Sequence, residues 1–306
     1  MESFYRELGL WGDIRERVVL SSLLCSTAPM DSRLTTRHIR QRKGQKKIVA
    51  LTAYDYSTAY WLDEEVDLIL VGDSLGMVFA GESTTLNVTL DQMVYHTQAV
   101  TRAVRHAHVV ADLPFLTYQI SREKALLNAG RLLQEGRAQS VKLEGGREYA
   151  GLISKMVQIG IPVLGHLGLC PQRVHQLGGF YRQARSEEEQ QKLIDDAVAL
   201  EDAGVFGLVL ENIPDELSLR VTQRLTVPTI GIGAGVHCDG QILVVNDVLG
   251  TTPGKTPAFA KKYANLGQVI QKAVKAFAYD IRHSDTPNTC TPAEGAPLPV
   301  DVHGDC

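Results

Sequence analysis

The stretch that decides the fold reads Asp67-Leu68-Ile69-Leu70-Val71-Gly72-Asp73-Ser74-Leu75-Gly76. Its first half is a short apolar run with the composition of a buried strand, and a polar turn with two glycines follows directly. Runs of this kind recur along the chain, each followed by a longer segment with helical periodicity. This alternation is typical of repeated βα units and a parallel sheet.

Eight such strands can be counted from residue 46 onward. We expect them at Lys47–Ala53, Asp67–Gly72, His108–Leu113, Ser140–Leu143, Ile161–Gly165, Gly207–Leu210, Val227–Ile232 and Ile242–Val245. Eight strands joined by helices close into a barrel more naturally than they form an open sheet. The sequence therefore predicts an α/β protein with the architecture of a (β/α)8 TIM barrel.

Two helix starts are marked by capping boxes, in which two side chains each bond to the other residue's free backbone N–H. Thr89 with Gln92, and Ser186 with Glu189, have this spacing. After Ser186, apolar residues recur at helical spacing and predict a helix that packs one stripe on the barrel. We expect its acidic residues to face solvent and to bind nothing: Glu187, Glu188 and Asp195.

The 306 residues are predicted to form one domain with two extensions. Residues 30–283 form the single (β/α)8 barrel catalytic domain. Residues 1–29 lie outside the βα pattern, and we expect a poorly ordered N-terminal extension; Met30 offers a second translation start beside Met1. Residues 284–306 are rich in Pro, Thr, Gly and Asp, and this composition predicts a disordered tail.

Composition excludes several classes of protein. A formal net charge of -4 with scattered basic residues gives no field that would attract nucleic acid. No apolar run approaches the ~18 residues that span a bilayer, so we expect no membrane span. The cysteines are odd in number and form no C-x-x-C pair, which indicates a reducing, cytoplasmic compartment without a disulfide framework. They are Cys25, Cys170, Cys238, Cys290 and Cys306.

Carboxylates follow three successive strands. Asp73, Asp112 and Glu144 each end a strand, and the carboxyl ends of barrel strands meet at one mouth, where barrel enzymes carry their activity. Three hard oxygen donors side by side suit Mg2+ and do not suit a soft metal. The alternative for each acid alone is that it caps the following helix or accepts backbone hydrogen bonds in a turn.

Lys142 precedes Glu144 by two residues, so strand alternation places both side chains on the same face. One interpretation is a cation that receives a substrate carboxylate beside the metal. A second is a buried ion pair with Glu144 or Asp112. A third is a Schiff-base lysine, which the neighbouring carboxylates disfavour because they hold its pKa high.

Glu211 ends an almost wholly apolar strand, and such surroundings raise a carboxyl pKa and favour a general base near neutral pH. The alternative is a carboxylate bound in the first turn of the next helix. His166 follows the fifth strand and is a candidate pocket residue or, equally, a packed histidine with satisfied hydrogen bonds.

Several segments together resemble the ketopantoate hydroxymethyltransferase family, and they occur in that family's order over residues 32–281. They are Val71-Gly72-Asp73-Ser74-Leu75-Gly76-Met77, Tyr95-His96-Thr97, Ala111-Asp112-Leu113-Pro114-Phe115, Lys142-Leu143-Glu144-Gly145-Gly146, Gly165-His166-Leu167-Gly168-Leu169, Leu210-Glu211, Gly231-Ile232-Gly233-Ala234-Gly235 and Asp239-Gly240-Gln241. The resemblance implies a TIM barrel of the phosphoenolpyruvate/pyruvate type.

The resemblance also implies roles for residues that match the family's motifs. Mg2+ would be held by Asp73, Asp112 and Glu144. The 2-oxo acid would contact Asp73, Ser74, Asp112 and Lys142, with its carboxylate received by Ser74 and Lys142. Glu211 would be the proton acceptor.

The activity implied by this resemblance is hydroxymethyl transfer from 5,10-methylenetetrahydrofolate, as co-substrate, to 3-methyl-2-oxobutanoate through a metal-stabilised enolate. The product would be 2-dehydropantoate, a precursor of pantothenate and coenzyme A. The family further implies a large homo-oligomer, usually a decamer.

The chain departs from the family's usual pattern in a loop that contains Glu82, Ser83 and Asn87, which leaves loop closure and folate affinity open. Two rival functions are kept. One is another metal-enolate barrel lyase or mutase of the isocitrate lyase kind. The other is a non-catalytic barrel that serves binding or assembly, against which the acids at successive strand ends argue.

Overall fold

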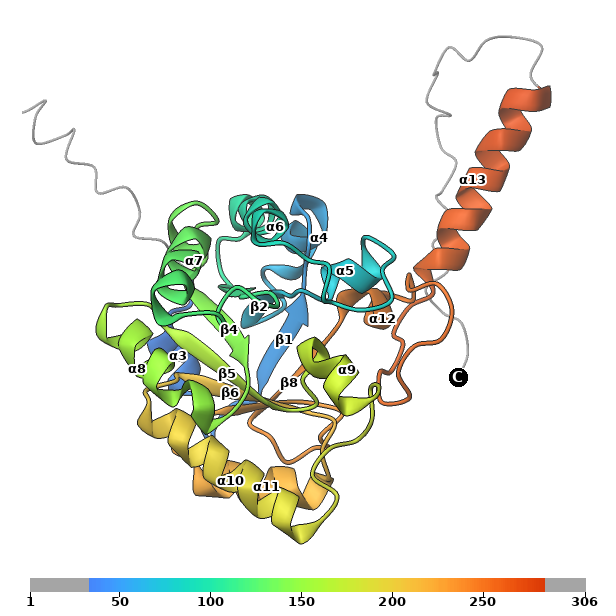
Figure 1. Ribbon diagram of the computed structural model, residues 1–306. Coiled ribbons are helices and arrows are strands. Elements are labelled where there is room, and N and C mark those ends of the chain that lie inside the picture. The colour runs from blue at the N-terminus through green and yellow to red at the C-terminus, as the bar shows by residue number, and fades with distance from the viewer. Residues whose placement is uncertain (1–32, 284–306) are drawn as a thin grey trace, which may run out of the picture. The chain divides into compact units, whose positions relative to one another are not determined.

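Eight parallel strands close into a barrel in the computed structural model, which describes residues 33–283 (Figure 1). Each strand pairs with the next along the chain, and β8 pairs with β1. The strands are β1 (Ile48–Thr52), β2 (Leu68–Val71), β3 (His108–Asp112), β4 (Ser140–Glu144), β5 (Val163–Gly168), β6 (Gly207–Glu211), β7 (Thr229–Ile232) and β8 (Gly240–Leu243). The predicted (β/α)8 TIM barrel is confirmed.

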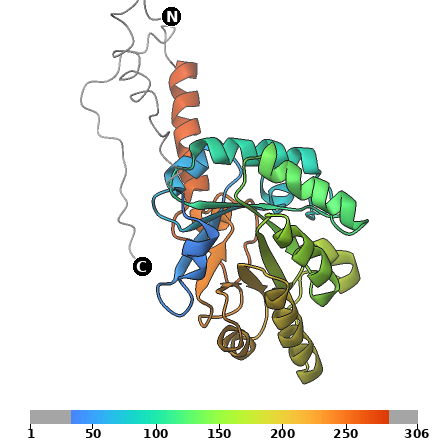
Figure 2. The ribbon, with the colours of Figure 1, turned by 90° about the vertical axis from the view of Figure 1, so that its left-hand side faces the viewer.

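Helices cover the outside of the barrel, as two views at right angles show (Figures 1 and 2). The longer ones are α4 (Tyr56–Leu62), α6 (Leu90–Ala103), α7 (Arg122–Gln134), α8 (Ala150–Gln158), α10 (Glu187–Asp202) and α11 (Asp215–Arg224). Short elements are α3 (Thr36–Arg40), α5 (Leu75–Val78), η1 (Arg147–Tyr149), η2 (Pro171–Arg173) and α9 (Val174–Leu177). Apart from α3, which precedes β1, these short elements lie in loops that follow the carboxyl ends of strands, where they position side chains at the mouth.

The barrel interior is filled by aliphatic side chains from the strands. Its core includes Ile48, Ala50, Leu68, Leu70, Val110, Leu164, Val209, Ile230 and Ile242, with Phe206 directly before β6. All residues of β2, β3 and β4 are buried, as expected for strands covered by side chains on one face and by helices on the other. The interior is thus a packed core, and a site has room only at an end.

All eight strands lie where the sequence predicts them, within a few residues. The eighth was expected at Ile242–Val245 and is found at Gly240–Leu243. Gly240 pairs with Ile48, and a Cβ at Gly240 would lie 2.5 Å from the Ile48 carbonyl oxygen, so the two strands can approach this closely only with a glycine here. Residues 246 and 247, shortly after this strand, lie in a helix.

Both predicted capping boxes are present, at Thr89 with Gln92 and at Ser186 with Glu189. The helix that begins after Ser186 buries an apolar stripe and exposes the acids expected to face solvent, Glu187, Glu188 and Asp195. Local hydrogen-bond chemistry therefore fixed these helix starts correctly.

The chain divides into two compact units, one through Val245 and one from Asn246 onward. The second begins within α12 (Val245–Leu249) and contains α13 (Leu266–His283), a helix with no buried residue. The extension predicted for residues 1–29 and the tail predicted for residues 284–306 lie outside the described residues, and the single domain expected at 30–283 stays a prediction. Between residues 33 and 283, no helix is long and apolar enough to cross a membrane.

Candidate active site

Asp73 and Asp112 are neighbours at the mouth of the barrel. The backbone N–H of Asp73 donates to Asp112 Oδ2 at 2.9 Å, and both residues are buried. Gly72 leaves room for the Ser74 hydroxyl, because a Cβ at Gly72 would lie 2.8 Å from Ser74 Oγ. The helix-capping alternative does not hold for Asp73, since Ser74 is the N-cap of α5 and no side chain caps that helix.

Lys142 lies between the acids of neighbouring strands. Its Nζ is 3.1 Å from Asp112 Oδ1 and 3.8 Å from Glu144 Oε1, and the lysine is buried. Although burial alone would lower the pKa of Lys142, the charges of Asp112 and Glu144 raise it above its ordinary value. An ammonium held in this way is charged at neutral pH, which disfavours the Schiff-base interpretation and agrees with the ion pair.

His166 connects Lys142 to Glu211. Lys142 Nζ lies 3.1 Å from His166 Nδ1, and His166 Nε2 lies 3.2 Å from Glu211 Oε2. Burial and the charge of Lys142 hold the pKa of His166 well below its ordinary value, so the ring is neutral. An ammonium can only donate, so Nδ1 accepts and the ring proton is on Nε2, facing Glu211. The Nε2–Glu211 pair lacks the alignment of a hydrogen bond, and Nε2 has no other partner in the described chain.

Glu211 is the last residue of β6, and its side chain is 16% exposed. Burial raises the pKa of Glu211 to about 7, against a smaller lowering by Lys142. Gly168 lets the end of β6 come close: its φ is +95°, and any side chain there would meet the Glu211 carbonyl. In the described structure the Glu211 carboxylate makes no hydrogen bond to α11, so the alternative of a helix-bound carboxylate is wrong.

Ser74 and Tyr54 form one side of the mouth. Tyr54 Oη and Ser74 Oγ are 2.9 Å apart, and the Tyr54 carbonyl accepts from His96 Nδ1 at 2.6 Å. Ser74 is half-buried and next to Asp73, so a ligand of the carboxylates would meet its hydroxyl. The structure brings Ser74 to the predicted site together with the three acids, Lys142, His166 and Glu211.

Gln172 is a site residue that the sequence did not reveal. Its Nε2 donates to Asp73 Oδ2 at 2.8 Å and to the Leu113 carbonyl at 2.9 Å, while its backbone N–H donates to Glu144 Oε2 at 3.1 Å. Its Oε1 accepts from the Tyr118 hydroxyl at 2.9 Å. Neither Gln172 nor Tyr118 follows a strand directly, so no position in the βα pattern marked them.

Negative charge is in excess in this cluster. Four carboxylates share the single ammonium of Lys142: Asp73, Asp112, Glu144 and Glu211. Burial, together with the charge of Asp112, raises the pKa of Asp73 to about 7. Burial likewise raises the pKa of Glu144 well above its ordinary value, and Asp73 and Asp112 add to the shift. A bound cation is the simplest way to keep all of these groups ionised.

The donors present fit a hard divalent cation. They are buried carboxylate oxygens, and Asp112 Oδ1 has no hydrogen bond among the described residues. In the described chain, no three acidic, histidine or cysteine side chains already surround one point at metal-binding distance. The contacts explain this, since Lys142 and Gln172 hold carboxylate oxygens that a cation would need. Metal binding at these acids would therefore require their side chains to rotate.

The fold and the buried carboxylates define a parallel (β/α)8 barrel with a polar site at the carboxyl ends of its strands. Solved structures share this fold. One is titled 2,3-dimethylmalate lyase, a PEP mutase/isocitrate lyase superfamily member; it covers 85% of this chain and 93% of its own, with a TM-score of 0.53 and 16% identity. At this identity the likeness concerns the fold alone.

Sequence comparison is more specific. The family model described as ketopantoate hydroxymethyltransferase matches residues 33–289. A protein of Thermoanaerobacter sp. (strain X514) named 3-methyl-2-oxobutanoate hydroxymethyltransferase is 50% identical over 255 residues, 83% of this chain and 93% of its own. One of that name from Syntrophus aciditrophicus (strain SB) is 51% identical over 265 residues, 86% and 97% of the two chains. The chain therefore belongs to the ketopantoate hydroxymethyltransferase family, whose members are one-carbon transferases.

Proposed function

We propose that this enzyme transfers a hydroxymethyl group from 5,10-methylenetetrahydrofolate to 3-methyl-2-oxobutanoate and so makes 2-dehydropantoate for pantothenate synthesis. The observation that carries the proposal is the buried cluster in which Asp73, Asp112 and Glu144 lie beside Lys142, with Glu211 next to it. Its chemistry suits deprotonation of a carbon beside a keto group. The names of the relatives supply the identity of the oxo acid.

Asp73, Asp112 and Glu144 would hold Mg2+ in this proposal. The ion would polarise the keto oxygen of the substrate and thereby make the neighbouring C–H more acidic. Lys142 would receive the substrate carboxylate together with the Ser74 hydroxyl. Since Lys142 is already charged and buried, it needs no proton transfer to do so.

Glu211 would take the proton from C3 of the oxo acid. A carboxylate with a pKa near 7 is both substantially ionised at neutral pH and basic enough to accept a proton. His166 would hold Glu211 in place through its Nε2 proton, because Lys142 at Nδ1 fixes the tautomer. His166 is therefore assigned a positioning role, and Glu211 the catalytic one.

The proposed reaction balances without oxidation or reduction. C3 forms a bond to the methylene carbon, and the two carbon–nitrogen bonds of the methylene bridge break. One water molecule supplies the hydroxyl oxygen. The C3 proton and one proton of water end on the two folate nitrogens, so the products are 2-dehydropantoate and tetrahydrofolate.

We further propose that the protein forms a homo-oligomer and lies in the cytoplasm. The family resemblance suggests a decamer. Support for association comes from α13, where Ile270, Val274, Phe277 and Ile281 form an exposed apolar stripe. Support for the compartment comes from Cys170 and Cys238, which are buried and free. Light scattering of the purified protein would measure the assembly directly, and a monomer would reject it.

The deciding experiment is an assay of the purified protein with 3-methyl-2-oxobutanoate and 5,10-methylenetetrahydrofolate, with and without Mg2+. The proposal expects 2-dehydropantoate only when both substrates and the metal are present. Product formed from the oxo acid without folate would instead favour a lyase. No product under any condition would reject the proposed function.

A further inference from the structure

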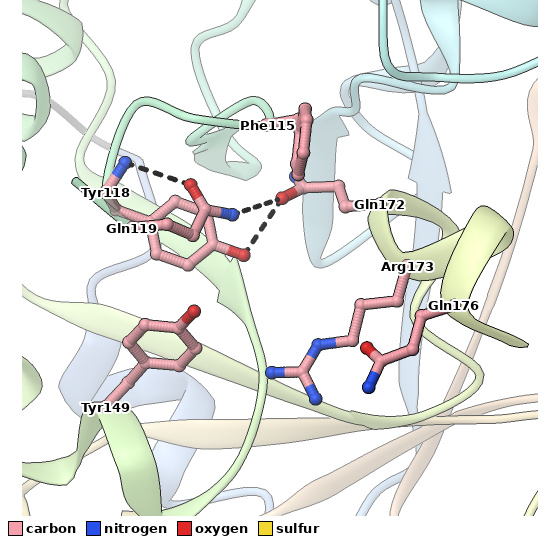
Figure 3. Close-up of a pocket in the computed structure, with 7 residues that line it drawn as sticks. All are labelled: Phe115, Tyr118, Gln119, Tyr149, Gln172, Arg173 and Gln176. Atoms are coloured by element: carbon pink, nitrogen blue, oxygen red, sulfur yellow. Dashed lines mark hydrogen bonds between the residues drawn. The ribbon is translucent and has the colours of Figure 1, made fainter.

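A pocket of about 320 Å3 opens beside the carboxylate cluster (Figure 3). Its walls come from loops that follow three neighbouring strands, β3, β4 and β5. The lining residues are Phe115, Tyr118 and Gln119 after β3, Tyr149 in η1, and Gln172, Arg173 and Gln176 in η2 and α9. Of these residues, only Gln172 bonds to the carboxylates of the proposed reaction centre.

Gln172 and Tyr118 separate the pocket from the carboxylates. Gln172 reaches Asp73 through its amide nitrogen, and its amide oxygen accepts from the Tyr118 hydroxyl. The Tyr118 hydroxyl also lies 3.0 Å from the Glu144 carbonyl oxygen. One layer of side chains thus stands between a molecule in the pocket and the predicted metal ligands.

The walls suit a flat, uncharged ring. Tyr118 and Tyr149 meet edge to face with ring centroids 5.2 Å apart, and Phe115 adds a third aromatic group. The planar guanidinium of Arg173 extends toward Tyr149 across the pocket (Figure 3) and can stack on a ring. Its charge is balanced by an ion pair with Glu148, so the pocket has no free cation that would select a carboxylate.

Hydrogen-bonding groups remain available around this space. Gln119 uses its carbonyl oxygen for the backbone of Tyr118 and its amide nitrogen for Gln172, which leaves one amide proton. The Gln176 carboxamide and the Tyr149 hydroxyl make no hydrogen bond to any other residue between 33 and 283. Donors and acceptors of amide type beside aromatic faces match the lactam edge of a fused heteroaromatic ring.

We propose that this pocket binds the pterin ring of the one-carbon carrier, an assignment that rests on the function proposed above. The methylene carbon to be transferred is attached to a nitrogen of that ring, so the ring must meet the carbanion-forming centre, and Gln172 would turn away from Asp73 to open the pocket toward it. A volume of about 320 Å3 is near the lower end of the ~300–1,000 Å3 typical of ligand sites. It accommodates the ring, while the rest of the carrier would extend out of the pocket.

Calorimetric titration tests the assignment, with Mg2+ and 3-methyl-2-oxobutanoate present throughout. The probes are tetrahydrofolate and a tetrahydropterin that lacks the aminobenzoyl-glutamate tail. Gln176→Ala removes one exposed carboxamide, and Tyr149→Leu removes one ring; each should weaken both probes about tenfold or more. Gln191→Ala, on the exposed side of α10, is the matched control and should change neither affinity.

The other outcomes distinguish a wrong pocket assignment from a wrong proposed function. Unchanged affinity for both probes in both variants would overturn the pocket assignment. Weakening of tetrahydrofolate alone would place the tail, not the ring, in the pocket and would overturn it as well. If the unsubstituted protein exchanges the C3 proton of the oxo acid but binds neither probe, the folate carrier is wrong. If it does neither, the proposed function itself fails.

Discussion

His166 Nε2 lies 3.2 Å from Glu211 Oε2, while the other ring nitrogen of His166 faces Lys142 at 3.1 Å. A buried cation therefore sets the tautomer of a neutral histidine, and the Nε2 proton of that histidine lies on the side of a carboxylate with a raised pKa, without the alignment of a hydrogen bond. The arrangement spans three neighbouring strands, because Lys142 is on β4, His166 on β5 and Glu211 on β6. Contacts through His166 thus link Glu211, the proposed base, to the group expected to hold the substrate carboxylate.

Glu211→Gln should leave metal binding intact and slow exchange of the substrate's C3 proton with solvent by at least about a hundredfold, since general-base catalysis contributes roughly that much or more. Exchange is measured by NMR in deuterated water with the oxo acid and Mg2+. Glu216→Gln, on the exposed start of α11, is the control. Exchange at the unsubstituted rate would reject Glu211 as the base.

The pH dependence of this exchange should follow ionisation of Glu211. Burial raises the pKa of Glu211 to about 7, and only the deprotonated carboxylate accepts a proton, so the rate should rise with pH and level off about one pH unit above the pKa. A bound cation nearby would lower the pKa, which places the midpoint between 4.5 and 7. An exchange rate that does not change across this pH range would contradict the assignment. The same rise with pH in Glu211→Gln would contradict it as well.

Asp112→Asn should weaken binding of Mg2+, or of Mn2+ as its spectroscopic substitute, by at least about tenfold. Loss of a residue that only supports a metal ligand already lowers metal affinity by about this much, and loss of a charged ligand should lower it at least as far. Asp112 is central, since it contacts both Lys142 and the backbone of Asp73. Electron paramagnetic resonance of free Mn2+ gives the affinity. The control is Asp202→Asn, at an exposed position of α10, which should bind Mn2+ as tightly as the unsubstituted protein does. Equal Mn2+ affinities for the two variants would show that Asp112 is not a metal ligand.

Strand ends were the part of the site that sequence could predict. Asp73 and Asp112 come at the ends of apolar runs and Glu144 follows the stretch Ser140-Val141-Lys142-Leu143, and parallel strands in a barrel bring such positions to one mouth whatever the loops do. The pairing of Asp112 with Lys142 and of Glu144 with His166 across strands follows from register. Strand pattern and topology therefore predicted where these residues lie, while their role as metal ligands stays a prediction.

Loop residues could not be found in the same way. Gln172 reaches Asp73 only because Pro171 begins the short turn η2 and α9 continues it, and neither element has a periodicity that sequence reveals. The exact bounds of the eighth strand depend on a distant contact as well, that of Gly240 with Ile48, almost two hundred residues earlier in the chain. Contacts between distant segments decided both.

Lys142→Met should destabilise the metal-free protein by about 3–5 kcal/mol at pH 8, because it leaves buried carboxylates without their cation. Added Mg2+ should recover part of this loss, since the ion supplies the missing positive charge. Urea unfolding with and without Mg2+ measures both effects. Lys155→Met, on the exposed face of α8, is the control and should stay within about 0.5 kcal/mol. A Lys142→Met protein as stable as the control would show that the ion pair does not stabilise the fold.

His108, which lies outside the active site, should make the stability of the fold sensitive to acid. Its Nδ1 donates to the Leu34 carbonyl at 2.9 Å and its Nε2 accepts from Ser140 Oγ at 2.8 Å, so the folded protein holds the ring neutral. Burial, with a smaller effect of Arg33, lowers the pKa of His108 from 6.5 to about 4. Because the unfolded chain binds this proton first as pH falls, the stabilisation is complete above 6.5 and is lost progressively toward 4. The loss amounts to roughly 3 kcal/mol.

His108→Gln should therefore lose less stability than the unsubstituted protein when the pH is lowered from 6.5 to 4, although it is less stable at pH 7. Glutamine keeps a donor and an acceptor but does not titrate, so the difference between the two unfolding curves isolates the histidine. His175→Gln, on the exposed side of α9, removes a histidine that the fold does not bury and should change the pH dependence little. Parallel curves for His108→Gln and the unsubstituted protein would mean that His108 is not kept neutral by the fold.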